Sequence, residues 1–156
     1  MSKNSKSAQK RYPRKSPGEE MDERMFVPIL TYGEQSNLLE WTKRTLIVAS
    51  QKYSDLATNV IMNSDYGLPE VPDAADYDFA TPVGAIQYKS DLDDYKRDLR
   101  KIVYHKKEFY FFLFGNLSSE SVDAIKRRPN YEEFHGNDPL ALWMAVKETH
   151  GVNENY

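Results

Sequence analysis

The chain contains no cysteine among its 156 residues. This absence excludes disulfide frameworks, thiolate zinc sites, cysteine nucleophiles and iron–sulfur clusters, because each of them needs cysteine sulfur. Long apolar runs are lacking as well: the longest, 109–114, is far shorter than the roughly 18 to 20 residues that span a bilayer. The amino terminus has charges but no apolar segment of the kind that a secretory signal requires. We therefore expect one cytoplasmic domain with no membrane partner.

Signatures of catalysis are also absent from the sequence. The seven glycines are scattered, and they form neither G-x-G-x-x-G nor a Walker loop, while no serine lies in a G-x-S-x-G elbow. His105, His135 and His150 are dispersed and show no metal-ligand spacing. His150 is explained by its place at the end of a predicted helix, where a cation offsets the helix dipole. The sequence thus predicts no catalytic residue, cofactor, metal or small-molecule substrate, and we do not expect an enzyme.

Acidic residues are missing from the first 17 positions, which hold six lysines and arginines. The remainder carries 15 basic and 24 acidic residues, so a basic arm precedes an acidic body. The arm has too little apolar surface to offset the entropy of ordering, which predicts disorder over 1–24. Two interpretations stay open: a polyanion-binding or nuclear-import segment, or a solvated leader. Under the first, RNA would bind non-specifically and in a salt-sensitive way, through Lys10, Arg11, Arg14 and Lys15.

The first predicted helix spans 37–63. Apolar residues recur there at steps of three and four, which is typical of one buried helical face. Asn37 followed by Glu40 resembles a capping box, in which the two side chains satisfy backbone N–H groups of the first turn. The preceding stretch, 25–30, is apolar and interrupted by Pro28, which favours an extended conformation.

Lysine and arginine are absent between 64 and 84, a segment with five carboxylates, three prolines and two glycines. Calcium is the specific hypothesis for such a loop. An EF-hand, however, needs carboxylates at alternate positions, a glycine at position six and a glutamate at position twelve, and this segment does not provide that frame. The sequence predicts a solvated acidic connection.

The second predicted helix runs from Tyr88 to Leu113 and ends at Gly115. Its polar face alternates acidic and basic residues at helical spacing, which favours structural ion pairs. Its last turns, 109–114, are apolar all round and must be buried or lie at a subunit contact, with a strand as the alternative. The basic residues between Lys96 and Lys107 form the strongest cationic patch of the body, and a solvated helix face is the simpler interpretation of it.

Two further helices are predicted near the carboxyl end. Ser118 is placed to cap a short helix that ends before Pro129, and Asp138 with Pro139 opens a helix that closes at Gly151. With no persuasive strand, the sequence predicts an all-α bundle of about four main helices over 25–151, followed by a short tail at 152–156. We expect its core to include Trp41, Tyr53, Leu56, Leu99, Leu113 and Trp143.

The order of short motifs resembles one known family. The stretch Asn37-Leu38-Leu39-Glu40-Trp41 resembles the N-x-x-x-W opening of copia-type LTR-retrotransposon Gag proteins. Leu117-Ser118 with Ser121 and Ile125 is similar to the "leucine-serine" helix of that family. Asp138-Pro139-Leu140 and Leu142-Trp143 before His150 are similar to its "aspartate-proline, leucine-tryptophan" helix. The resemblance covers about 29–150, and each motif is short, so the information lies in their order and spacing.

This resemblance implies an all-α, capsid-like region of Gag that self-associates into a particle shell and catalyses nothing. Trp41 and Trp143 would be core anchors, and the partner would be further copies of the same chain. The chain departs from the family in two ways: Gly33 lies four residues before Asn37 instead of two, and the Cys/His zinc knuckle is missing because there is no cysteine. A nucleic-acid-binding accessory protein that uses the basic arm is the alternative function.

Overall fold

A computed structural model describes residues 26–33 and 36–151. The basic arm, including Lys10, Arg11, Arg14 and Lys15, and the tail at 152–156 lie outside these described residues. Within them the fold is all-α, as the sequence predicts, and the only extended pairing is a single bridge between Leu30 and Leu117. The α-helices are α2 (Leu38–Tyr53), α3 (Asp55–Asn63), α4 (Pro82–Phe114), α5 (Ser119–Lys126), α6 (Tyr131–Phe134) and α7 (Pro139–His150).

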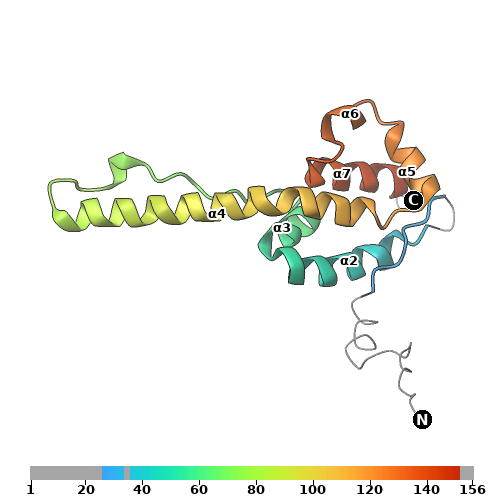
Figure 1. Cartoon of the computed structure of the whole chain (residues 1–156), viewed down its shortest axis with the longest axis horizontal. Coiled ribbons are helices and arrows are strands. Elements are labelled where there is room, and N and C mark those ends of the chain that lie inside the picture. Colours follow the sequence, from blue (N-terminus) through green and yellow to red (C-terminus); the bar gives the residue numbers. More distant parts are fainter. Residues whose placement is uncertain (1–25, 34–35, 152–156) are drawn as a thin grey trace, which may run out of the picture.

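Most of these helices form a small bundle around the carboxyl-terminal part of α4 (Figure 1). Helix α7 packs against α3, α4 and α5, and α2 packs against α3 and α4. The buried centre includes Trp41, Phe109, Tyr110, Leu113 and Trp143, with the two indole rings stacked at a centroid distance of 6.1 Å. The last turns of α4 are therefore helical, and the expectation of burial for 109–114 holds only in part: Phe109, Tyr110 and Leu113 are buried, whereas Phe111 is exposed.

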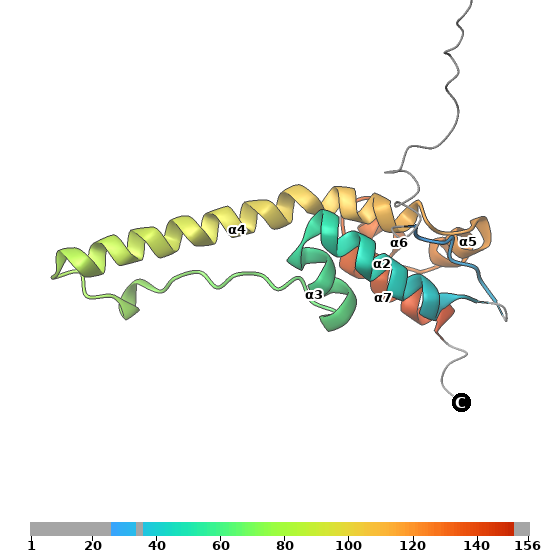
Figure 2. The same cartoon turned by 90° about the horizontal axis from the view of Figure 1, so that it is seen from below.

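The core expectation holds for Trp41, Tyr53, Leu56, Leu113 and Trp143, all of which are buried. The expectation for Leu99 is wrong, because its side chain is only half-buried and lies outside the core cluster. The physical reason is the length of α4: its 33 residues span about 50 Å, so its first half projects beyond the bundle (Figures 1 and 2).

The helix predicted over 37–63 is broken at Ser54 into α2 and α3. Ser54 has φ 54° and ψ −133°, a conformation that residues with a Cβ rarely adopt. The break turns α3 back so that it packs against α2, α4 and α7. Periodicity could not reveal it, since the apolar steps continue through the break.

Replacing Ser54 with glycine is expected to stabilise the protein by about 1 kcal/mol, because glycine adopts this backbone conformation without strain. Urea denaturation followed by circular dichroism at 222 nm measures the change. Ser50→Gly is the matched control, since Ser50 lies within α2 and the substitution should lower stability there by about 0.5 kcal/mol, the difference in helix propensity between serine and glycine. A loss of stability in Ser54→Gly would contradict strain at this position.

The capping box predicted at Asn37 does not form. Its side chain makes no cap hydrogen bond; its Oδ1 instead accepts from the Thr31 backbone N–H at 2.8 Å, and its Nδ2 donates to the Ile29 carbonyl at 3.0 Å. Through these two hydrogen bonds, Asn37 links the extended residues 29–31 to the start of α2. The caps at Ser118 and Asp138 do form, with Oγ and Oδ1 accepting from the backbone N–H groups of Ser121 and Ala141 at 3.1 Å each.

One further helix boundary and one additional helix also differ from the prediction. Helix α4 begins at Pro82 and not near Tyr88, because the Thr81 hydroxyl accepts from the Gly84 N–H at 3.0 Å and Pro82 occupies the first helical position. The short helix α6 was not expected. Together with the break at Ser54, it raises the number of α-helices within the described residues from about four to six.

Candidate interaction surface

The first half of α4 lies beside an extended segment, 64–81, which we call the acidic strap (Figures 1 and 2). It holds one short 3-10 turn, η3 (Ala74–Asp76), and five carboxylates with no lysine or arginine. Near its end the Tyr77 hydroxyl donates to Asp91 Oδ2 at 2.7 Å, and this hydrogen bond raises the pKa of Tyr77 to about 12. The rings of Tyr77 and Phe79 both contact the ring of Tyr88 edge-on, with distances between ring centroids of 5.1 and 5.2 Å. The strap therefore covers one face of α4.

That covered face carries the apolar residues that predicted the helix. Tyr88, Leu92, Tyr95 and Leu99 follow one another at steps of four, three and four, and all are half-buried. An extended segment, not a helix layer, lies beside this face, and Tyr88 contacts the rings of Tyr77 and Phe79 in it (Figure 2). The remaining circumference of α4 in this region faces solvent.

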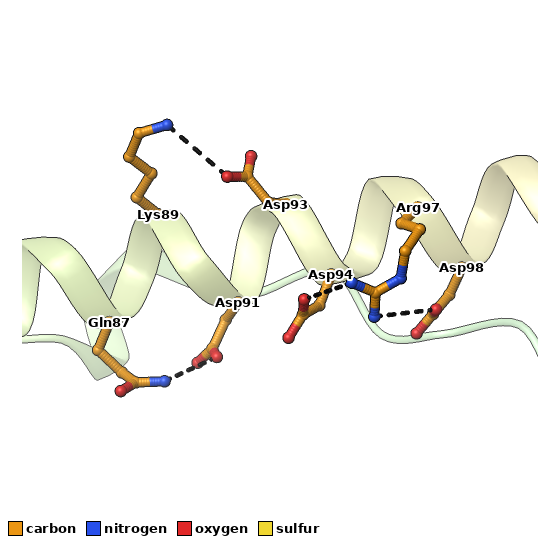
Figure 3. A network of polar contacts seen from close by, with 7 residues as sticks. All are labelled: Gln87, Lys89, Asp91, Asp93, Asp94, Arg97 and Asp98. Atoms are coloured by element: carbon orange, nitrogen blue, oxygen red, sulfur yellow. Dashed lines mark hydrogen bonds and ion pairs between the residues drawn. The ribbon is translucent and has the colours of Figure 1, made fainter.

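In the same region, α4 carries a ladder of polar contacts (Figure 3). Arg97 Nη1 lies 2.9 Å from Asp94 Oδ1 and its Nη2 lies 3.4 Å from Asp98 Oδ1. Lys89 pairs with Asp93 at 3.7 Å, and Gln87 Nε2 donates to Asp91 Oδ1 at 2.8 Å. These contacts match the expectation of ion pairing within the helix. They are exposed, so each contributes little to stability, typically below about 1 kcal/mol.

Apolar residues flank this ladder at both ends of α4. Val83 and Ile86, near the tip, are 74% and 68% exposed. Tyr104 and Phe111, nearer the bundle, are 73% and 45% exposed. An open groove lies beside the latter two, lined by Lys52, Tyr53, Tyr104, Lys107, Glu108, Phe111 and Phe112.

Sequence reasoning missed Val83 and Ile86 because it began the helix at Tyr88. The signal that could have found them is Thr81 followed by Pro82, a side-chain cap with proline at the first helical position. Sequence reasoning did find the patch between Lys96 and Lys107: Lys96, Arg97, Arg100, Lys101 and Lys107 are exposed, and Arg97 is engaged by its two aspartates.

A buried serine–histidine pair is the arrangement most reminiscent of catalysis. His150 Nε2 lies 2.8 Å from Ser121 Oγ, and His150 Nδ1 lies 3.1 Å from the Val146 carbonyl. Ser121 is fully buried, and its hydroxyl also lies 2.9 Å from the Leu30 carbonyl. The pair links α5 to α7, and its second imidazole nitrogen faces a carbonyl where a catalytic triad has a carboxylate.

His150 also corrects the dipole interpretation made from the sequence. Burial lowers the pKa of His150 below its ordinary value, although its hydrogen bond to the Val146 carbonyl acts in the opposite direction. His150 Nδ1 lies 3.1 Å from the Val146 carbonyl and 2.7 Å from the Thr149 hydroxyl, and Nε2 lies 2.8 Å from Ser121 Oγ, whose own proton is donated to the Leu30 carbonyl. The residue therefore serves as a neutral core group instead of a terminal cation.

Acidification is accordingly expected to destabilise the fold through His150. The unfolded chain binds a proton near pH 6.5 and the folded chain only at lower pH, so the free energy of unfolding falls as the pH drops below about 6.5. Urea midpoints at pH 7.5, 6.5 and 5.5 measure this slope. His150→Gln should show a shallower decline, and an equal decline in both proteins would contradict the assignment.

Other kinds of site find little support within 26–33 and 36–151. No group of three histidine or carboxylate side chains there could hold a metal ion. No helix in the same part of the chain is both long and apolar enough to cross a membrane.

A cavity of about 260 Å³ lies between α3, the start of the strap and α4, lined in part by Asp55, Asp98, Lys101 and His105.

Comparisons of the chain with family models, with curated proteins and with solved structures give no match. The residues themselves therefore carry the functional argument.

Proposed function

We propose that this chain is a structural protein that self-associates into a capsid-like particle, as a Gag-like protein of a copia-type retrotransposon or a derivative of one. The resemblance in the order of its motifs supports this proposal, together with the all-α fold. It requires no catalysis and no cofactor. Its partner is another copy of the same chain.

The observation that carries the proposal is the uncovered face of α4. A helix that projects from its bundle, with exposed apolar side chains at both ends, presents surface that a partner can bury. Val83, Ile86 and Tyr104 are each more than two-thirds exposed on this one helix. Burying such residues between copies would favour association through the hydrophobic effect.

Light scattering on size-exclusion fractions tests the proposal across a concentration series, at low and high salt, with and without RNA. We expect the mean mass to grow with protein concentration. A monodisperse monomer under every condition would contradict self-association.

A second candidate function is non-specific RNA binding, as an accessory protein. Lys96, Arg100, Lys101 and Lys107 are exposed along α4 and could add to the charge of the basic arm. Titration of labelled single-stranded RNA with the full chain should then show affinity that falls steeply with salt and drops when 1–17 is deleted. Equal affinity after the deletion would exclude the arm from binding.

A further inference from the structure

Six residues form a continuous line along the uncovered side of α4, which we call the outer stripe: Val83, Ile86, Asp93, Arg97, Tyr104 and Phe111. Their separations of three, seven, four, seven and seven keep them on one face of a helix. All six are exposed, and the stripe lies opposite the face that the acidic strap covers. Figure 3 shows Asp93 and Arg97 in the middle of this helix.

The stripe lies on a helix whose charge changes sign along its length. Residues 82–95 contain one basic and three acidic side chains, whereas 96–107 contain six basic and one acidic. Two such helices placed side by side in parallel would bring like charges together. An antiparallel arrangement brings each acidic half against a basic half, which lowers the electrostatic free energy of the pair.

The exposed apolar residues of the stripe also favour an antiparallel arrangement. Val83 and Ile86 lie at the tip, and Tyr104 and Phe111 border the groove near the bundle. In an antiparallel pair the tip of each helix comes beside the groove of the other. The apolar ends of the stripe are thereby covered together with the charged middle.

One register satisfies both kinds of contact. Ile86 and Tyr104 are each nine residues from Tyr95, and Asp93 and Arg97 are each two residues from it. A two-fold axis at the level of Tyr95, but on the uncovered side of α4, therefore sets Ile86 against Tyr104 and Asp93 against Arg97, each pair occurring twice. Arg97 is oriented by Asp94 and Asp98, which engage Nη1 and Nη2 but not all five N–H groups of the guanidinium.

We propose that the outer stripe of α4 binds the same stripe of a second copy in an antiparallel, two-fold symmetric pair, with Asp93 of each copy facing Arg97 of the other. This inference rests on the proposed function, because it names the surface through which copies associate. RNA fits the stripe less well, since the acidic half of α4 repels phosphate.

Charge exchange between two variants tests the pairing. Asp93→Arg places two cations on the stripe, and Arg97→Asp places two anions there, so each variant alone meets like charges in the proposed pair. We expect sedimentation-equilibrium experiments to show association weakened about tenfold or more for each variant alone. An equimolar mixture should recover association close to that of the wild type, since cations on one copy then face anions on the other.

The mixture guards against effects within one chain. It contains the same two polypeptides, so recovery on mixing cannot come from a change in helix stability. Asp123→Arg and Lys126→Asp are matched controls, because they make the same charge changes at exposed positions of α5. These two variants should associate like the wild type, alone and mixed.

The outcomes separate this inference from the proposed function. If the wild type associates and the α4 variants associate equally well, the outer stripe is not the interface, while self-association stands. Weak association of the single variants without recovery on mixing would also overturn the register. If the wild type stays monomeric, both the inference and the proposed function fail. Recovery that depends on added RNA would instead place RNA at this surface and overturn direct pairing.

Discussion

Trp41→Ala is expected to lower the free energy of unfolding by about 3–5 kcal/mol, the typical loss when a large aromatic side chain is removed from a core. Trp41 is fully buried, its ring stacks on Trp143, and its Nε1–H donates to the Asn116 carbonyl at 3.1 Å. The substitution therefore removes packing against α7 and a hydrogen bond to the turn after α4. Urea denaturation monitored by circular dichroism at 222 nm measures the loss.

A matched control lies two residues away on the same helix. Leu39 is 67% exposed, so Leu39→Ala should change stability by about 0.5 kcal/mol or less. In a double-mutant cycle of Trp41→Ala with Trp143→Ala, we expect coupled and not additive losses, because the two rings stack on each other. A loss below about 1 kcal/mol for Trp41→Ala would contradict its place at the centre of the core.

The second large effect is expected from Asp138→Ala, with a loss of about 2–3 kcal/mol. Asp138 Oδ1 caps α7 by accepting from the Ala141 N–H at 3.1 Å, and it also accepts a hydrogen bond from the Tyr66 hydroxyl. Burial, reinforced by this hydrogen bond, raises the pKa of Tyr66 above its ordinary value. Alanine would remove the cap and leave the half-buried Tyr66 hydroxyl without its acceptor.

Asp138→Asn and Tyr66→Phe separate these two contributions. Asparagine is as good a cap as aspartate, so Asp138→Asn should lose clearly less than Asp138→Ala. In a double-mutant cycle of Asp138→Ala with Tyr66→Phe, we expect a coupling free energy of about 1 kcal/mol. Zero coupling in urea denaturation would show that Tyr66 and Asp138 do not interact.

Trp41→Ala and Asp138→Ala lower the stability of the fold, and they should weaken association through α4 only by lowering the fraction of folded protein. The outer stripe lies on the opposite side of α4 from the strap and includes no residue of the buried core cluster. Stability variants and stripe variants therefore affect different measurements: the former shift urea midpoints, and the latter shift the dissociation constant of the folded protein.

The fold class and several helix ends could be predicted from the sequence because their causes are local. Ser118, Asp138 and Pro139 act within three residues of the backbone groups that they satisfy, and apolar steps of three and four define one helical face wherever they occur. Among the core residues, Trp41 and Trp143 are large, apolar and in phase with their helices, so their burial follows from the same pattern.

The break at Ser54 and the half-burial of Leu99 could not be predicted in this way. Ser54 adopts its unusual conformation because α3 packs back against α2, α4 and α7, and contacts between distant residues outweigh local helix propensity. Leu99 fits the apolar phase of α4, yet its side chain is only half-buried and lies outside the core cluster. Periodicity shows which face of a helix is apolar, but not how far its neighbours extend.

Some features of the candidate surface on α4 could likewise be predicted from the sequence, and others could not. The alternation of charges on α4 and the helical spacing of its residues follow from the sequence alone, because both depend only on the order of the chain. The cover of one face by the acidic strap, the projection of α4 from the bundle and the exposure of the outer stripe become known only from the packed fold. The physical reason is that burial depends on all the segments that pack against a helix, and those segments are far apart in the sequence.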